Sequence, residues 1–158
     1  MSIIDMGLTQ ALKDAGQWEI FDRAEAKGQD EKRWYYLKAF DCDYYLCSVN
    51  AMTEDGVLVN IDGNGNRVAA ITYGPHHVIF VVGLNKVCQN VEAALSRARS
   101  TAAPLNTTRL DLDTPCSKDG VCHNCNTDHC ICNYVHFIRN SYPAGRHTVI
   151  LVGEPLGY

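Results

Sequence analysis

The chain has 158 residues, of which 46% are apolar and 20% charged, and its net charge at neutral pH is −4. This length suits a single domain (1–158), and the composition is that of an ordinary globular protein, which argues against disorder. The longest apolar run, Val78–Gly83, is far shorter than the roughly 20 residues of a membrane-spanning helix. Scattered Lys and Arg argue against a nucleic-acid partner. Because the N-terminus lacks a secretory signal pattern, we expect a cytoplasmic protein without a membrane partner.

The first forty residues predict two helices. Apolar residues at helical spacing indicate a helix over 3–15 that ends at Gly16, and Trp18–Phe21 is expected to form a short strand. A second helix is expected over 29–40, with acidic residues in its first turn, where they suit the helix dipole.

The rest of the chain alternates between strands and helices. Strands are expected over 44–49, 57–61, 78–82, 134–138 and 148–152, and the β-branched run 78–82 is typical of a parallel strand. The segment 67–73 has no clear period and fits helix or strand. Residues 90–102 predict a helix, with Pro104 beyond its end. This order predicts right-handed βαβ units, an α/β fold with a mostly parallel sheet flanked by helices, and a cysteine-rich loop over 114–133.

The first glycine corner, Asn50–Gly56, directly follows a predicted strand. In open α/β folds the carboxyl edge of the sheet binds ligands, so we expect its side chains at that edge. Thr53, Glu54 and Asp55 supply a hydroxyl and two carboxylates suited to acid, base or ligand-binding roles. The alternative is a hairpin turn, because Asp-Gly between two apolar runs is a common hairpin signal.

The second corner, Asp62-Gly-Asn-Gly-Asn-Arg-Val68, has the composition of a phosphate-binding loop, with backbone amides pointing inward and Arg67 adding a fixed charge. It fits neither a Walker loop nor the dinucleotide fingerprint. Calcium is rejected because Arg67 and Tyr73 replace the glycine and the glutamate of a calcium loop. The alternative is a solvated turn. The segment Gly83–Lys86 follows the strongest strand and is placed to line the same ligand edge.

Five of the eight cysteines lie close together in the sequence Cys116-x5-Cys122-x2-Cys125-x4-Cys130-x-Cys132. In a cytoplasmic protein such clustering favours a shared metal over disulfides. Thiolates at this spacing suit a tetrahedral zinc site or an iron–sulfur cluster, and sulfur ligation alone leaves both open. A redox pair at Cys122 and Cys125, or a flexible loop with incidental thiols, is the alternative.

Seven motifs together resemble the LUD domain family of lactate-utilisation proteins over residues 3–158. They are Asn50-Ala-Met-Thr-Glu-Asp-Gly, Leu58-Val-Asn-Ile-Asp-Gly-Asn-Gly-Asn-Arg-Val-Ala-Ala, Gly74-Pro, Val82-Gly-Leu-Asn-Lys, Ala103-Pro-Leu-Asn, Pro115-Cys and Ile131-Cys-Asn. The resemblance implies a fold similar to sugar-phosphate isomerases and CoA transferases, and it places the site at the two glycine corners. Fold likeness transfers no activity.

The predicted site residues follow from the corners, the third loop and the resemblance. Glu54 and Asp55 are the catalytic candidates, and the ligand-binding candidates are Asn50, Thr53, Asn60, Asp62, Gly63, Asn64, Gly65, Asn66, Arg67, Asn85 and Lys86. The family's cysteine pattern maps onto Cys116, Cys122, Cys125 and Cys132 as metal ligands. Cys130 falls where the family often has arginine, which makes it a bystander or a competing ligand.

The resemblance also implies that the chain begins after a further helix, a strand and a Gly-Gly-Ser corner. Such a sheet would have an exposed edge, so we expect another copy to cover it in a homo-oligomer. Three functions remain open. The first is a lactate-utilisation protein that binds a small anionic metabolite and a metal and works with iron–sulfur and flavin proteins. The second is an isomerase or transferase acting on a sugar phosphate or acyl-CoA, and the third is a structural zinc domain.

Overall fold

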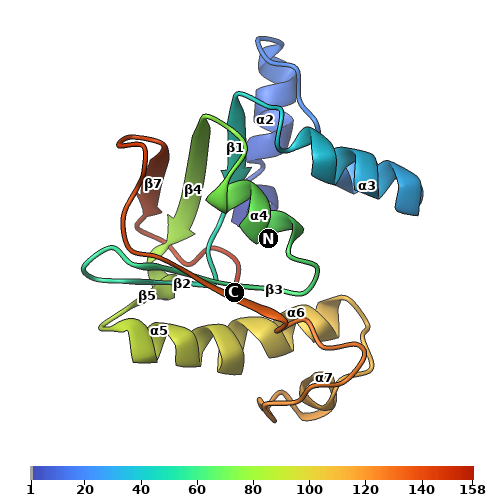
Figure 1. Cartoon of the computed structure of the whole chain (residues 1–158), viewed down its shortest axis with the longest axis vertical. Coiled ribbons are helices and arrows are strands. Elements are labelled where there is room, and N and C mark those ends of the chain that lie inside the picture. Colours follow the sequence, from blue (N-terminus) through green and yellow to red (C-terminus); the bar gives the residue numbers. More distant parts are fainter. Residues whose placement is uncertain (1) are drawn as a thin grey trace.

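The computed structural model describes residues 2–158 as a mixed α/β protein with a parallel sheet flanked by helices (Figure 1). That sheet has the order β1-β4-β7, from β1 (Tyr44–Cys47), β4 (His77–Gly83) and β7 (His147–Val152). Both strand pairs are parallel, with Tyr44 opposite His77 and Val78 opposite His147. All three strands therefore end at the same edge. Among residues 2–158, none of the helices combines the length and apolar character needed to cross a bilayer.

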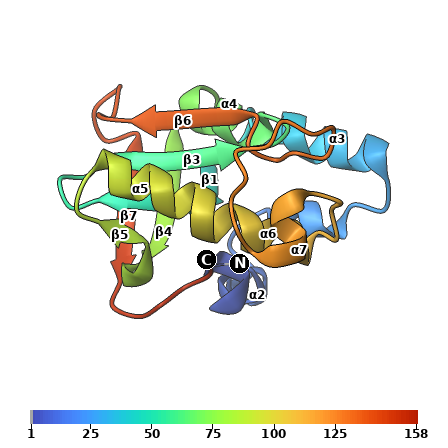
Figure 2. The ribbon, with the colours of Figure 1, turned by 90° about the horizontal axis from the view of Figure 1, so that it is seen from below.

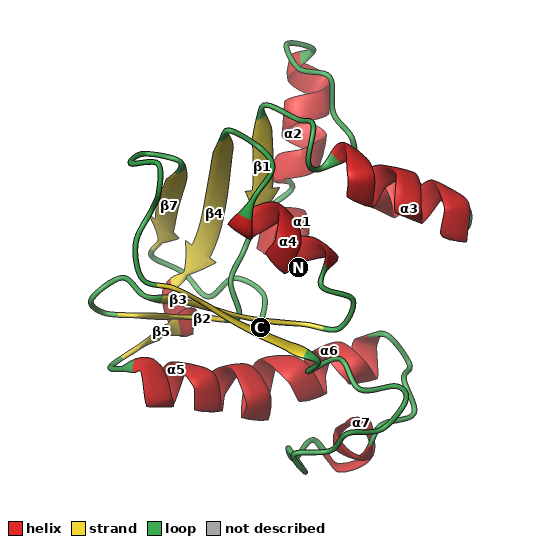
Figure 3. Cartoon of the chain, in the orientation of Figure 1, coloured by secondary structure: helices red, strands yellow, loops and turns green. Residues whose placement is uncertain are grey.

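A second sheet lies across the carboxyl edge of the first one (Figure 3). Its order is β5-β2-β3-β6, formed by β5 (Val87–Cys88), β2 (Ala51–Thr53), β3 (Leu58–Asp62) and β6 (Tyr134–Ile138). The β2–β3 and β3–β6 pairs are antiparallel, and only β2–β5 is parallel. The expectation of one mostly parallel sheet therefore holds for β1, β4 and β7 alone. The difference arises at Gly56, whose φ of 95° lets the chain reverse into a hairpin.

The N-terminal part departs from the sequence prediction at two points. The helix expected over 3–15 is two helices, α1 (Ser2–Asp5) and α2 (Leu8–Ala15), because Gly7 adopts a left-handed conformation between them. Gly16 ends α2 as expected. The predicted strand Trp18–Phe21 is wrong: the segment is irregular, and its Trp18 ring packs edge-to-face on Tyr44 at 5.8 Å.

The other helices are α3 (Gln29–Lys38), α4 (Asn66–Thr72), α5 (Val91–Arg97), α6 (Ala103–Arg109) and α7 (Pro115–Asp119). Short 3-10 turns lie at Arg23–Glu25 and Leu84–Lys86. Helix α4 shows that the ambiguous segment is helical. A π-helical turn, Ala98–Ala102, joins α5 to α6, so the helix continues through Pro104 instead of ending before it. In Figure 2, α5 and α6 cross the lower face of the second sheet.

Two apolar clusters hold these layers together. One lies between the parallel sheet and α4, and its buried members are Cys47, Val49, Leu58, Ile71, Val78, Phe80 and Val82. The other lies between the second sheet and the long helix, and it contains Ala51, Val59, Ile61, Ala94 and Ala98. Alanines at helical spacing allow the helix to approach the strands closely, so the second sheet is covered from below. The two clusters hold the two sheets in place, and the carboxyl edge of the parallel sheet lies between them.

Candidate functional site

Polar residues gather where β1 and β4 end. Ser48 and Asn50 follow β1, and Asn85 and Lys86 follow β4. The tail after β7 reaches the same place, because the Ser2 hydroxyl donates to the Leu156 carbonyl at 3.1 Å and lies 3.2 Å from the Ser48 hydroxyl. The sequence expectation that Asn50, Asn85 and Lys86 share one sheet edge matches this placement.

Lys86 is the most unusual residue of this edge, because its side chain is only 2% exposed. Its ammonium donates to the Ser2 hydroxyl at 3.0 Å, the Ser48 hydroxyl at 3.2 Å and the Val49 carbonyl at 3.2 Å. All three acceptors are neutral. Burial, and then the nearby charges of Arg97 and Arg67, together lower the pKa of Lys86 to about 8.

Arg67 spans the gap between the two sheets. Its guanidinium donates to the Ser48 carbonyl at 3.0 Å, the Asn50 side-chain oxygen at 2.8 Å and the Ile61 carbonyl at 2.7 Å. A longer contact of 3.3 Å reaches the side-chain oxygen of Asn60, a fully buried residue of β3. The nearest carboxylate is that of Asp62, 4.0 Å from Arg67 Nε. Arg67, Asn50 and Asn60 are thus brought together as the sequence predicted.

Arg97, at the end of α5, is a member of this edge that sequence reasoning missed. Its Nε donates to the Asn85 carbonyl at 2.9 Å, and its NH1 donates to the Asn50 carbonyl at 2.6 Å. Partial burial lowers the pKa of the guanidinium. The sequence offered one signal for it. Arg97 lies three residues after Ala94, so the two share one face of the helix, and Ala94 is an apolar residue of the expected core face.

The second glycine corner is closed by its own carboxylate. Asp62 accepts hydrogen bonds from the backbone amides of Asn64, Gly65, Arg67 and Val68 at 3.0–3.2 Å. A phosphate-binding loop would use these amides to hold its ligand. In this loop they donate to the Asp62 carboxylate instead. Asn66 begins α4. Gly63 lies against Ile131, and the Asn133 side chain donates to its carbonyl at 3.0 Å.

The first glycine corner is a β-hairpin, and only Asn50 of it lies at the sheet edge. The Thr53 hydroxyl is buried, donates to the Asp55 carboxylate and accepts from the Val57 amide at 2.8 Å, so it fastens the turn. Glu54 and Asp55 are exposed. They lie at one end of β3, and Asp62 lies at the other. This five-residue strand spans roughly 14 Å. The structure does not bring Glu54 and Asp55 to Arg67.

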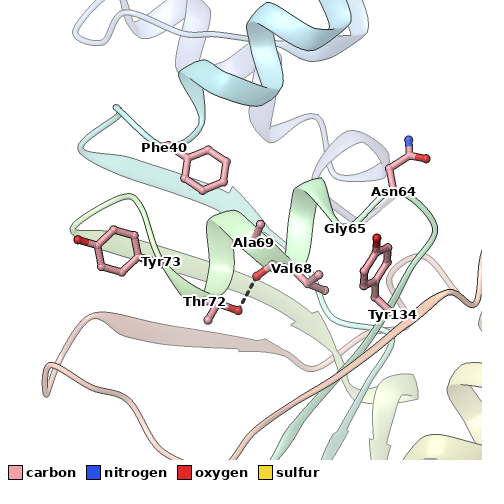
Figure 4. A pocket seen from close by; sticks show the side chains of 8 residues that line it. All are labelled: Phe40, Asn64, Gly65, Val68, Ala69, Thr72, Tyr73 and Tyr134. Atoms are coloured by element: carbon pink, nitrogen blue, oxygen red, sulfur yellow. Dashed lines mark hydrogen bonds between the residues drawn. The ribbon is translucent and has the colours of Figure 1, made fainter.

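An open hollow of about 500 Å³ lies on the outer side of α4 (Figure 4). It is lined by Phe40, Asn64, Gly65, Val68, Ala69, Thr72, Tyr73 and Tyr134. None of these side chains is charged, and the Thr72 hydroxyl already donates a hydrogen bond to the Val68 carbonyl at 2.7 Å. The hollow includes the predicted residues Asn64 and Gly65 but lacks a group that would recognise an anion.

The cysteine loop forms a second polar centre. A small cavity of about 40 Å³ is lined by Arg99, Ala103, Cys116, Cys122, His123, Asn124, Cys125, Cys130 and Cys132. Burial, and then the neighbouring Cys130, Cys122 and Cys116, together raise the pKa of Cys132 to about 12. The pKa of Cys125 is also raised, by desolvation and then by Cys130. The thiols of Cys125 and Cys132 are therefore protonated at neutral pH.

The five thiols do not yet form a ligand set. Within residues 2–158, no three or more Cys, His, Asp or Glu side chains are positioned to hold a metal ion. All eight cysteines are free thiols. The donor chemistry fits a thiophilic metal, but ligation would require these side chains to turn toward a common point.

The comparison with protein families decides which family this is. A family model described as the LUD domain matches residues 1–152, which include both the sheet edge and the five cysteines. The chain belongs to the LUD domain family. Searches of curated proteins and of solved structures found no match. The family membership of this LUD domain therefore rests on the family model. The candidate site rests on the contacts and burial of its own residues.

Proposed function

We propose that this LUD domain binds a small anionic metabolite of the hydroxycarboxylate class, to which lactate belongs, at the edge where β1 and β4 end. The observation that carries the proposal is a cluster of three cations, Arg67, Lys86 and Arg97, held by neutral acceptors. Among residues 2–158, neither Lys86 nor Arg97 has a carboxylate within ion-pair distance, and Arg67 has only Asp62 at 4.0 Å. An anion would supply the missing charge.

The electrostatics of the cluster support binding of an anion. Arg67 and Arg97 both lower the pKa of Lys86, so the three charges lie close enough to repel one another. A carboxylate about 4 Å from one of these cations would gain about 4 kcal/mol at an effective dielectric constant of about 20. Asn50, Asn60 and Asn85 add amide groups that suit the hydroxyl of a hydroxy acid.

The isomerase or transferase hypothesis has less support. It needs Glu54 or Asp55 as a base next to a phosphate held by Arg67, and these groups lie at opposite ends of β3. The position of the cation cluster at the carboxyl ends of parallel strands supports a relation to the sugar-phosphate isomerase and CoA transferase fold. Cooperation with iron–sulfur and flavin proteins, and assembly into a homo-oligomer, stay predictions from the family resemblance.

Calorimetric titration with L-lactate and with inorganic phosphate tests the proposal. We expect saturable lactate binding that Arg97→Gln weakens by roughly tenfold to a hundredfold, the value of one charge-assisted hydrogen bond. Arg33→Gln, the same charge change on the exposed side of α3, should leave affinity within about twofold. Arg97→Lys should bind lactate with intermediate affinity. This variant keeps the positive charge but loses the guanidinium geometry, so it separates the two contributions.

Two results would contradict the proposal. One is the absence of saturable binding by either anion to folded protein. The other is equal affinity of Arg97→Gln and Arg33→Gln, because it would show that the cluster is not the site. Near-native circular dichroism of each variant confirms that a loss of binding is not a loss of fold. Glu54→Gln with Asp55→Asn should leave the affinity unchanged, since that turn is remote from the cluster.

A further inference from the structure

The five cysteines of the loop meet at one cavity, although the sequence pattern assigned only four of them to a metal. Cys116 and Cys130 are the most deeply buried, each 7% exposed. The Cys130 sulfur accepts a hydrogen bond from the Cys132 amide at 3.3 Å and lies 3.7 Å from the Cys125 carbonyl. Cys130 is therefore buried in the cavity lining, next to Cys125 and Cys132.

The cavity lining also carries a positive charge. Arg99 lines it, and one of its terminal nitrogens donates to the Asn124 side chain at 2.7 Å. Its Nε is buried and, within the part of the chain that the structure describes, has no hydrogen-bond partner. A thiol sulfur is only a weak hydrogen-bond acceptor, so the five thiols offer this donor no strong partner. Thiolate sulfurs on a metal ion would provide an acceptor and a compensating charge.

The loop contains little regular structure. No helix or strand is present between α7, which ends at Asp119, and β6, which begins at Tyr134. Its apolar contacts lie at its C-terminal end, where Ile131 lies against Gly63 and Cys132 packs on the second core cluster, whereas Val121 is 59% exposed. A segment of this length without secondary structure is unusual in a compact domain, and a shared metal ion is one way to order it.

We propose that the five-cysteine cavity binds one thiophilic divalent ion of the zinc type, and that Cys130 is one of its ligands. A cavity of about 40 Å³ between the five thiols suits a single ion. Each ligating thiol releases its proton to solvent as the metal–sulfur bond forms, and no electron transfer is involved. A zinc ion with four thiolates carries a net negative charge, which Arg99 offsets.

Zinc binding by anaerobically purified, chelator-treated protein tests this inference. We expect one zinc ion per chain, measured by titration against a chromophoric chelator. Cys130→Ser should lower the zinc affinity at least tenfold even though a fifth cysteine is available to replace it. Cys42→Ser is the matched control, because Cys42 lies in the loop after α3, outside the cavity, and its loss should leave zinc binding unchanged.

Cobalt substitution separates the ligand set from the mere presence of metal. The wild type should show ligand-field bands of a tetrahedral site and thiolate-to-cobalt charge transfer, and Cys130→Ser should lose charge-transfer intensity or shift the bands. Failure of folded protein to bind zinc, or recovery of an iron–sulfur cluster, would overturn the metal assignment. Unchanged zinc affinity and cobalt spectrum in Cys130→Ser would overturn the role of Cys130. None of these outcomes depends on anion binding at the cation cluster.

Discussion

The buried ammonium of Lys86 makes the stability of this protein depend on pH in a way that one variant isolates. Its ordinary pKa of 10.5 falls to about 8 in the folded protein, mainly through burial and then through Arg97 and Arg67. Between these two values the unfolded chain binds more protons than the folded one, so stability rises with pH. Below pH 8 both states are protonated, and the full cost of burying the charge is present. The difference of about 2.5 pKa units corresponds to about 3 kcal/mol.

The comparison with Lys86→Met removes every other titration from the measurement. Urea unfolding of both proteins at pH 7 and at pH 10.5, with a reducing agent present, gives the free energy of unfolding in each condition. The advantage of wild type over Lys86→Met should increase by about 3 kcal/mol between the two pH values, whatever the hydrogen bonds of the neutral amine are worth. A difference that stays constant, or decreases, would show that Lys86 is not buried as a charged group and would refute this reasoning.

Two further predictions concern packing at the two ends of the parallel sheet. Arg146 is 8% exposed and donates to the carbonyls of Ala70 and Ile71 at the end of α4. Arg146→Met should therefore lower the free energy of unfolding by about 3 kcal/mol, and Arg146→Lys should lower it by less. A Cβ at Gly83 would overlap the tail backbone, so Gly83→Ala should cost about 2 kcal/mol and weaken lactate binding, whereas Gly153→Ala, with open space around it, should cost less than about 0.5 kcal/mol. Chemical denaturation checks each variant, and equal stability of the two alanine variants would contradict the packing argument.

Sequence reasoning found Arg67 from the composition of the second glycine corner, and it found Lys86 from one rule. Residues that follow parallel strands meet at the carboxyl edge, and this placed Asn50 and Lys86 together without knowledge of their contacts. Arg97 escaped because it comes from a helix beneath the second sheet. Its approach to Asn50 depends on how the two sheets are stacked, which strand order alone does not determine.

The Asp55–Gly56 turn shows where sequence signals were ambiguous. The same residues fit a ligand corner after a parallel strand and the turn of a hairpin, and both interpretations were open. Tertiary pairing decided between them, because β3 also pairs antiparallel with β6 at the far end of the chain. The two carboxylates of Glu54 and Asp55 consequently face solvent. A local pattern cannot report a partner strand that is more than seventy residues away.

The long helix beneath the second sheet connects the two proposed sites. Proline removes a backbone donor and crowds the carbonyl four residues before it, which is why Pro104 was expected to lie beyond the helix. The π turn Ala98–Ala102 widens the helix just before that point, so α5 continues into α6. Arg97 and Arg99 are two residues apart and therefore project from different sides of the helix, one to the Asn50 carbonyl and the other to Asn124 of the cysteine loop. The same helix therefore carries both arginines, and its continuation into α6 places Ala103 in the wall of the cysteine cavity.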